Sequence, residues 1–237
     1  MLTSGFFLNA NNQQVAKWAF SDREGGKSGA PYDSLNLATH VGDNSLAVAF
    51  NRSLVLQEFG FTDATWPGPV HGTDIGLVEK STGLFPDVDG LITKRKETVL
   101  TTLGADCVPL IAVEVENKIA LTAHIGWRGA ASEIHNSITD AIENLGGNLK
   151  FTQILLGPAI CGDCYKVDAE RIEEVCRVLP HAKINDGLDL RLGLKNIFKS
   201  KVQSVEMVGE CPFETSQLYS HRRDGVTGRQ AGFVVLL

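Results

Sequence analysis

Three apolar segments rich in β-branched and aliphatic residues follow one another along the chain, and they constrain the fold more than any other feature. They span residues 99–103, 108–115 and 118–123, and each has the length and composition of a buried β-strand. The last two are separated only by Glu116-Asn117, which predicts a hairpin. A sheet built from such neighbours has antiparallel pairs, so we do not expect a simple series of β-α-β crossovers.

Helical patterns alternate with these strands and with further short apolar segments. Apolar residues at helical spacing, N-capping side chains and terminal glycines predict helices over about 46–58, 134–145 and 168–179. Further strands are expected at 152–156, 202–208 and 233–237. We therefore expect an α+β fold, a layered sandwich of mixed β-sheets flanked by helices, with residues 1–237 forming a single domain.

Charge and composition exclude several classes of function. The 237 residues hold 22 Lys and Arg against 28 Asp and Glu, a net charge of −6, and no basic run suited to nucleic acid. No segment approaches the roughly 18 apolar residues of a membrane helix, and no secretory leader is recognised. Five cysteines at irregular spacing do not suggest a disulfide framework, so a reducing cytoplasm is expected. The sequence does not fix an oligomeric state.

Three metal-capable residues, His71, Cys107 and His124, each lie at the edge of an apolar segment beside glycine or proline. Such positions, where strands pass into loops, often carry ligands and catalytic groups. One thiolate and two imidazoles form a reasonable ligand set for zinc, with the fourth position open to water or substrate. The separations of 36 and 17 residues are not those of a zinc finger, so a buried free cysteine with two hydrogen-bonded histidines is the alternative.

Arginines provide candidate anion sites. Arg128 lies between a strand and the helix that carries Ile134, where backbone N–H groups and a guanidinium favour a phosphate or carboxylate. An early polar loop, followed by Asn51-Arg52, and the segment 222–229 are two further polar sets. Solvated surface charge is the alternative for all three.

A CxxC motif, formed by Cys161 and Cys164, suggests either a redox dithiol or half of a structural zinc site. A zinc ribbon needs a second close pair, whereas Cys176 and Cys211 are single and distant in the sequence. A thioredoxin-like motif opens a helix directly, which this segment does not. We therefore expect no function for this pair.

Together, these motifs resemble the laccase-domain family of bacterial cytoplasmic proteins, also called the multicopper polyphenol oxidase or purine nucleoside phosphorylase family. The matching blocks extend over nearly the whole chain: Arg23-Glu24-Gly25-Gly26 with Ser28, Tyr32, Ser34-Leu35-Asn36-Leu37, Val41-Gly42-Asp43, Asn51-Arg52, Val70-His71-Gly72, Asp89-Gly90-Leu91-Ile92-Thr93, Ala105-Asp106-Cys107-Val108-Pro109, His124-Ile125-Gly126-Trp127-Arg128-Gly129, Gly157-Pro158-Ala159-Ile160 with Cys164-Tyr165-Lys166-Val167, Asp189-Leu190, and Arg222-Arg223-Asp224 with Thr227-Gly228-Arg229. Ordered blocks of this number are far more specific than any one motif.

The resemblance implies one catalytic zinc bound by His71, Cys107 and His124. It also implies phosphorolysis of adenosine, inosine and methylthioadenosine, with adenosine deamination as a further activity. Ser28, Asn36 and Arg52 would then contact the substrate, and Arg52 or Arg128 would hold the phosphate. Copper is expected only as an adventitious ion, because six histidines and two methionines are too few for a multicopper oxidase.

The chain departs from the family pattern at Pro69, Gly104 and His221, where the family usually has Gln, Thr and an aromatic residue. These changes affect the expected substrate preference and not the metal ligands. Asp74 and Asp106 are candidate general acids or bases by proximity alone.

Three alternative functions remain open at this stage. One is a hydrolase that edits peptidoglycan precursors at the same zinc site. Another is a metal-free hydrolase with Cys107 as nucleophile and His124 as base. The third is a non-enzymatic zinc or partner-binding domain, which would unfold when its metal is removed.

Overall fold

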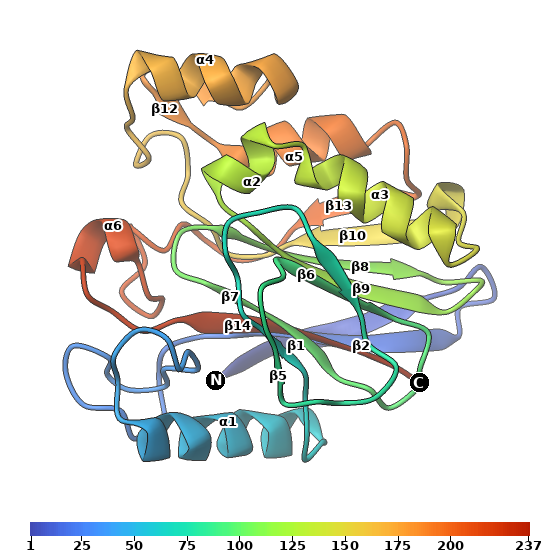
Figure 1. Ribbon diagram of the computed structural model, residues 1–237, viewed down its shortest axis with the longest axis horizontal. Helices are drawn as coiled ribbons and strands as arrows, with labels where there is room; N and C mark the ends of the chain where they lie inside the picture. Colours follow the sequence, from blue (N-terminus) through green and yellow to red (C-terminus); the bar gives the residue numbers. More distant parts are fainter.

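The computed structural model describes residues 1–237 and shows four layers (Figure 1). Two β-sheets lie face to face, and helices cover both outer surfaces. This arrangement confirms the predicted layered α+β sandwich. No helix is long and apolar enough to cross a membrane.

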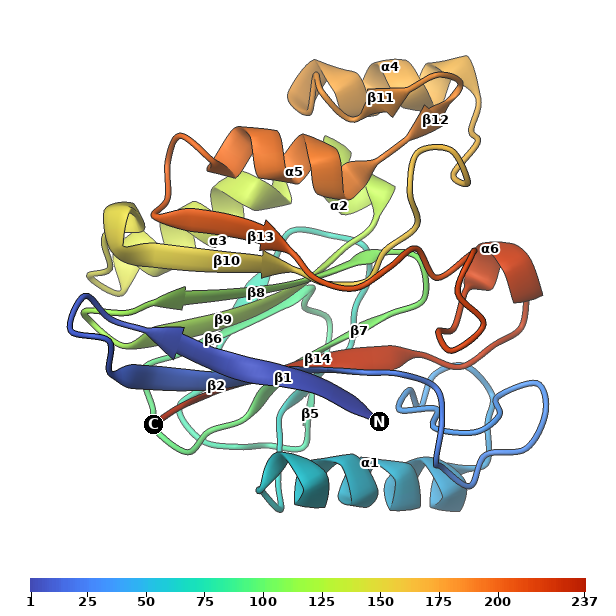
Figure 2. The ribbon, with the colours of Figure 1, turned by 180° about the vertical axis from the view of Figure 1, so that it is seen from behind.

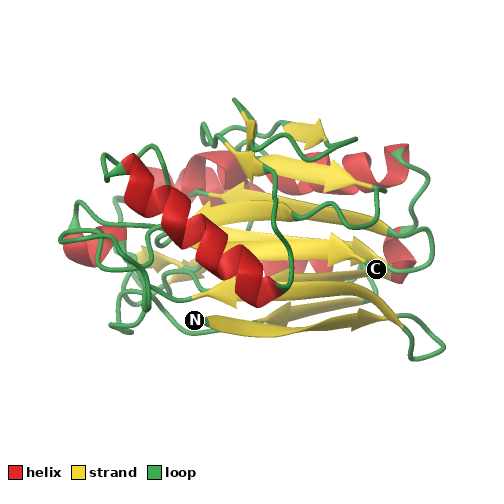
Figure 3. Ribbon diagram, turned by 90° about the horizontal axis from the view of Figure 1, so that it is seen from below, coloured by secondary structure: helices red, strands yellow, loops and turns green.

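The first sheet has four strands in the order β1-β2-β14-β7, and all its pairs are antiparallel. Its strands span Leu2–Leu8, Gln14–Ser21, Gln230–Leu236 and Leu100–Gly104, respectively. Helix α1, Ser45–Phe59, lies along its outer face (Figures 1 and 3). The N-terminal hairpin was not predicted from the sequence.

The second sheet has six strands and is mixed, as expected. In spatial order they are β13 (Ser204–Met207), β10 (Thr152–Leu156), β8 (Val108–Glu114), β9 (Ile119–Ile125), β6 (Gly90–Thr93) and β4 (Ile75–Leu77). The outer pairs, β10–β13 and β4–β6, are parallel, and the central pairs are antiparallel.

Helices α2 (Trp127–Ala131), α3 (Ile134–Asn144) and α5 (Leu190–Phe198) cover the outer face of the six-stranded sheet, and α4 (Ala169–Val178) packs on α2 farther out (Figure 2). The short elements are α6 (His221–Asp224), the 3-10 turn η1 (Leu149–Phe151), and the two-residue strand pairs β3 (Trp66–Pro67) with β5 (Leu84–Phe85) and β11 (Lys183–Ile184) with β12 (Gly187–Leu188).

Local sequence signals explain where the predicted helices begin and end. The Asn44 side chain accepts hydrogen bonds from the backbone N–H groups of Leu46 and Ala47, and Gly60 closes α1 in the left-handed conformation at φ 94°. Asp168 caps α4 in the same way, through the N–H of Arg171. These caps confirm the predicted helices at 46–58 and 168–179.

The segment 126–129 differs from the prediction. It does not open the helix that carries Ile134, because α2 forms first as a separate five-residue helix. Helix α3 begins only after Glu133, whose backbone is left-handed at φ 63°. The segment therefore opens α2 and not the long helix, and anion binding by Arg128 stays a prediction.

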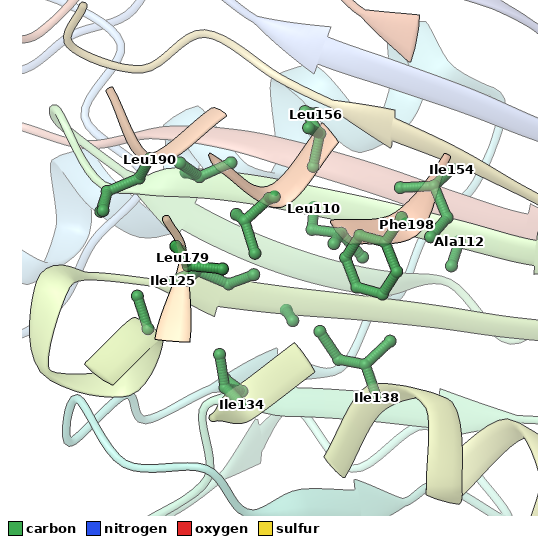
Figure 4. Close-up of a cluster of buried hydrophobic side chains, with 14 of the residues drawn as sticks. Leu110, Ala112, Ile125, Ile134, Ile138, Ile154, Leu156, Leu179, Leu190 and Phe198 are labelled. Atoms are coloured by element: carbon green, nitrogen blue, oxygen red, sulfur yellow. The ribbon is translucent and has the colours of Figure 1, made fainter. Parts of the chain in front are cut away.

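Three apolar clusters hold the layers together. The largest lies between the six-stranded sheet and its helices, where Leu110, Ile138 and Phe198 are fully buried (Figure 4). A second joins the two sheets, and a third packs α1 on the four-stranded sheet. Burying a side chain such as Leu or Phe stabilises a fold by about 1.5–3 kcal/mol, so these clusters fix the strand register on which the site depends.

At one edge of the sandwich, several strand ends meet. Gly104 at the end of β7 pairs with Gln230 at the start of β14. In the other sheet, Val108 at the start of β8 pairs with Ile125 at the end of β9. This edge, on the left of Figure 1 beside α6, carries the residues that can perform chemistry.

Candidate metal centre

His71, Cys107 and His124 converge at this edge of the sandwich, as the sequence predicts. Their Cys Sγ and imidazole nitrogen atoms all lie within 4.8 Å of one another. The two imidazole rings stand nearly perpendicular, at 84°, with centroids 4.9 Å apart. His124 is buried in β9, Cys107 is half-buried in the β7–β8 turn, and His71 is exposed on a loop. The group therefore has one face open to solvent.

A buried carboxylate, Asp89, organises this centre, and sequence reasoning assigned it no role. Its Oδ1 lies 2.9 Å from His124 Nδ1 and accepts the backbone N–H of His71 at 3.0 Å. Its Oδ2 accepts the N–H groups of Val70 at 3.2 Å and Gly72 at 2.6 Å. The Asp89 carboxylate thus fixes the loop that carries His71, and it leaves Nε2 of His124 available to a metal.

This carboxylate–histidine pair is the arrangement that orients imidazoles toward a metal in proteins. Asp89 is fully buried, at 0% exposure. In the sequence, Asp89 is the first residue of the family-like block that continues into strand β6. Burial would raise the pKa of this carboxyl, but the hydrogen bonds from His124 and Gly72 lower it.

Charge favours a thiolate at Cys107. Burial would raise the pKa of its thiol, but the charge and hydrogen bond of His124, with those of His71, lower it below the usual range. Burial would likewise lower the pKa of His124, whereas Cys107 and Asp89 raise it. Both shifts favour the thiolate form of Cys107, which is the form that binds metals.

The backbone around the centre is strained and closely packed. His71 and Asp106 have positive φ angles of 61° and 92°, a conformation that residues with side chains seldom adopt. A Cβ atom on Gly126 would lie 2.8 Å from His71 Cδ2 and 3.2 Å from Cys107 Sγ. Only glycine therefore lets the turn after β9 approach both side chains.

A cavity of about 390 Å³ opens beside the centre and collects positive charge. Arg128, Arg171 and Arg222 line it, together with His71 and Cys107. The Arg128 and Arg171 guanidinium carbons each lie 4.5 Å from the centre of the Trp127 ring. A volume of this size is ordinary for a small-molecule site, and the three arginines suit an anionic group.

The apolar part of this cavity comes from Trp127, Ile160, Tyr165 and Leu190. Arg222 stacks on the Tyr165 ring at 5.0 Å. The cavity therefore offers flat apolar surfaces next to its cationic groups.

A second cavity of about 250 Å³ meets the same centre from the other side. His40, Arg229 and His124 line it, and His71 and Cys107 border both cavities. Burial lowers the pKa of His40, and the neighbouring charge of Arg229 lowers it further. The metal-capable group thus lies where the two cavities meet.

The two candidate acid–base residues are placed differently. Asp106 lines the larger cavity, but Ser220 Oγ donates to its Oδ1 at 2.7 Å and the Arg222 N–H to its Oδ2 at 2.6 Å. Asp106 therefore holds the start of α6. Asp74 is exposed and lines neither cavity.

Ser28 and Asn36 lie in a buried network around Asp43. Ser28 Oγ donates to Asp43 Oδ2 at 2.6 Å, and Asn36 Nδ2 donates to the same oxygen at 2.9 Å. Asn36 Oδ1 also accepts the N–H of Arg229 at 3.0 Å. Neither residue lines the two cavities. Their role as substrate contacts stays a prediction, and the bonds seen here order the early loop behind Arg229.

Of the two predicted phosphate-binding arginines, only Arg128 lines a cavity. Arg52 stacks on the Trp66 ring at 3.9 Å and donates from Nε to the Leu37 carbonyl at 2.8 Å. Arg52 therefore has a packing role, which differs from the solvated surface charge considered as the alternative. Arg171, which sequence reasoning did not select, completes the cationic wall because α4 packs against α2.

Cys211 is distant from the CxxC motif in the sequence, but the fold brings the two together. Cys211, 47 residues beyond Cys164, lies beside it in space, and Glu214 completes a second metal-capable cluster. Cys176 lies in α4 and belongs to neither cluster.

Two β-sheets lie between layers of helices, and a solvent-open group of two imidazoles and one cysteine sulfur lies at one edge. These features define a class of layered α/β proteins that can bind a metal. The chain belongs to the family described as multi-copper polyphenol oxidoreductase laccase, whose model matches residues 17–237. This finding confirms the family resemblance predicted from the sequence.

Individual relatives span nearly the same length. A purine nucleoside phosphorylase of Streptomyces coelicolor is 35% identical over 231 residues, covering 93% of this chain and 96% of its own. Purine nucleoside phosphorylase YlmD of Bacillus subtilis is 33% identical, covering 95% and 90%. The crystal structure of the hypothetical protein YfiH of Bacillus licheniformis has a TM-score of 0.85 at 29% identity, covering 98% and 99%.

Proposed function

We propose that this protein is a zinc-dependent enzyme that cleaves purine nucleosides with phosphate. The observation that carries the proposal is the position of the His71, Cys107 and His124 group between two cavities, one of which has three arginines. The relatives named purine nucleoside phosphorylase support this substrate class.

The residues at the centre fit a zinc ion. Two imidazoles and one thiolate, with Asp89 orienting the buried histidine, match the donor set and the outer partner of a catalytic zinc site. A zinc ion bound there would supply a Lewis acid beside the substrate. The open side of the group faces both cavities, so a substrate oxygen has access to it.

The chain's own residues hold the anion in this proposal. Phosphorolysis forms a bond from a phosphate oxygen to C1′ of the ribose and breaks the bond from C1′ to the purine nitrogen. Arg128, Arg171 and Arg222 bind the phosphate by charge-assisted hydrogen bonds. The rings of Trp127 and Tyr165 provide apolar surfaces against which the flat purine packs.

His221 is in a position to influence the choice of purine. It borders both cavities, and its Nδ1 lies 2.6 Å from the Gly225 carbonyl. That hydrogen bond places the ring proton on Nδ1 and leaves Nε2 as an acceptor. We propose that Nε2 contacts the base or ribose, where the family usually has an aromatic residue.

The ligand chemistry favours zinc over copper in this proposal. A blue-copper site adds a weak axial ligand, often Met, to the same two histidines and cysteine. Met207 is in β13, and neither Met1 nor Met207 lines either cavity. Oxidation of phenols, if detected, should therefore be slow and depend on added copper.

A metal-free cysteine hydrolase is the second candidate, because His124 lies beside Cys107 and lowers the pKa of its thiol. Alkylation of Cys107 separates the two functions. A zinc ligand is protected when zinc is bound, and the alkylated protein then loses its metal. A hydrolase nucleophile reacts quickly in an active enzyme that contains no metal.

The direct test measures metal content and products on the same preparation. The purified protein is incubated with adenosine, inosine or methylthioadenosine, with and without phosphate. We expect the free purine base and a ribose 1-phosphate only when phosphate is present, and release of ammonia would reveal deamination. Cys107→Ala should abolish turnover, and Cys176→Ser is the matched control. Turnover that persists after complete zinc removal would contradict the proposal, and release of an amino acid from a muramyl conjugate would favour precursor editing.

A further inference from the structure

We propose that the chain contains a second, structural zinc site, formed by Cys161, Cys164, Cys211 and Glu214. The three sulfur atoms and one carboxylate oxygen lie within 4.8 Å of one another. A tetrahedral zinc ion with Zn–S bonds of about 2.3 Å separates its sulfur ligands by about 3.8 Å. The cluster therefore needs to contract by no more than about 1 Å to bind the ion.

The four residues come from two turns that have the same backbone hydrogen bonds. In the first turn, the Cys161 carbonyl accepts the N–H groups of Cys164 at 3.2 Å and Tyr165 at 2.9 Å. In the second, the Cys211 carbonyl accepts those of Glu214 at 3.1 Å and Thr215 at 3.0 Å.

Each turn contributes its first and fourth residues to the cluster. This is the spacing with which a CxxC turn presents two ligands to one zinc ion. Two such turns face each other here and together supply a complete set of four ligands.

Hydrogen bonds already connect the two turns. The Cys161 backbone N–H donates to Cys211 Sγ at 3.4 Å, and Cys164 Sγ lies 3.5 Å from Glu214 Oε1. These bonds hold the side chains of the two turns next to one another.

Surrounding residues hold the second turn rigidly. Arg223 donates to the carbonyls of Pro212, of Thr215 at 3.1 Å and of Leu218 at 2.8 Å. Cys211 is buried, and Cys161 and Cys164 are half-buried. A preformed turn reduces the entropy lost when the ion binds.

The ion would join the loop that follows β10 to the loop that precedes α6. The first loop borders the larger cavity through Ile160 and Tyr165. Helix α6, which directly follows the second loop, borders it through His221 and Arg222. All four ligand positions are filled by the protein, which is typical of structural rather than catalytic zinc. We therefore assign the site a role in holding the wall of the cavity.

Metal analysis of the reduced, full-length protein tests the proposal independently of any enzyme activity. We expect two zinc ions per chain in the wild type, one in Cys211→Ser and one in Cys107→Ala. The Cys107→Ala/Cys211→Ser double variant should bind none. Cys176→Ser, which changes a half-buried cysteine outside both clusters, should keep two. One ion in the wild type, lost only with Cys107, would overturn the second site and leave the proposed function intact.

Cobalt substitution provides a spectroscopic readout of the ligands in the second site. Cobalt(II) in the second site has three thiolate ligands against one in the first, so its sulfur-to-metal absorption should persist and dominate in Cys107→Ala. Glu214→Gln should shift this spectrum and weaken binding, whereas Glu206→Gln, an exposed control on β13, should not. A disulfide between Cys161 and Cys164, or bound iron and sulfide in place of zinc, would overturn the proposal.

Discussion

Replacing Asp89 with Asn tests whether one buried carboxylate holds the metal centre together. The substitution keeps the size of the side chain and removes its charge. One amide oxygen can still accept two of the four hydrogen bonds that Asp89 receives. The amide nitrogen is a donor, so two of the groups that donate to the carboxylate lose their acceptor.

Each hydrogen bond to a charged group contributes about 1.5–3 kcal/mol, so losing two lowers the free energy of unfolding by at most about 3–6 kcal/mol. A neutral amide costs less to bury than a carboxylate, which offsets part of this loss. We therefore expect Asp89→Asn to lower the free energy of unfolding by about 2–4 kcal/mol. Because Asp89 orients the His124 ring, its replacement should also weaken zinc binding about 10–100-fold.

Urea unfolding in the presence of a chelator measures the first effect, and competition with a chromophoric chelator measures the second. With an m value of about 2–3 kcal/mol/M, the urea midpoint should fall by about 1 M. Asp87→Asn is the matched control, because Asp87 is exposed and its left-handed backbone, at φ 57°, tolerates Asn. The reasoning is refuted if Asp89→Asn has the midpoint and the zinc affinity of the wild type.

Three further predictions concern the same edge of the sandwich. Cys107→Ala should lose the zinc of the first site while its circular dichroism stays unchanged, and full zinc retention would reject the ligand assignment. Gly126→Ala, whose Cβ would lie 2.8 Å from His71 Cδ2, should reduce zinc affinity at least about 10-fold. Gly29→Ala, with no atom within 4 Å of the added Cβ, should not. Arg52→Ala should lower the free energy of unfolding by about 1–3 kcal/mol, measured by urea unfolding, and an unchanged midpoint would show that its stacking is dispensable.

The elements that sequence patterns predicted well are those whose signals are local. Strands β8, β9 and β10 are buried on both faces, so their sequences are nearly continuous apolar runs. Helix α1 has an N-cap and a terminal glycine within the segment itself. The hairpin of β1 and β2 lacks such a signal, because β1 is mostly exposed or half-buried and mixes polar with apolar residues.

The candidate site was predictable only in part, because much of it depends on contacts between distant residues. His71, Cys107 and His124 were found through family blocks, each of which is local. Asp89 meets His124 across 35 residues through the pairing of β6 with β9, and no pattern in the sequence reports that contact. Cys211 reaches Cys161 across 50 residues, through two loops that no periodicity describes.

Helix α6 connects the two metal-capable clusters, so the stability of one should affect the chemistry of the other. On one side, Asp106, next to Cys107, holds Ser220 and the backbone of Arg222. On the other side, Arg223 holds the turn that carries Cys211. Loss of the second ion should therefore displace Arg222 before it disturbs the ligands of the first site. We expect weaker phosphate binding with unchanged zinc content in the first site. The reason is that the position of Arg222 in the cavity wall depends on α6, whereas His71, Cys107 and His124 lie on other elements.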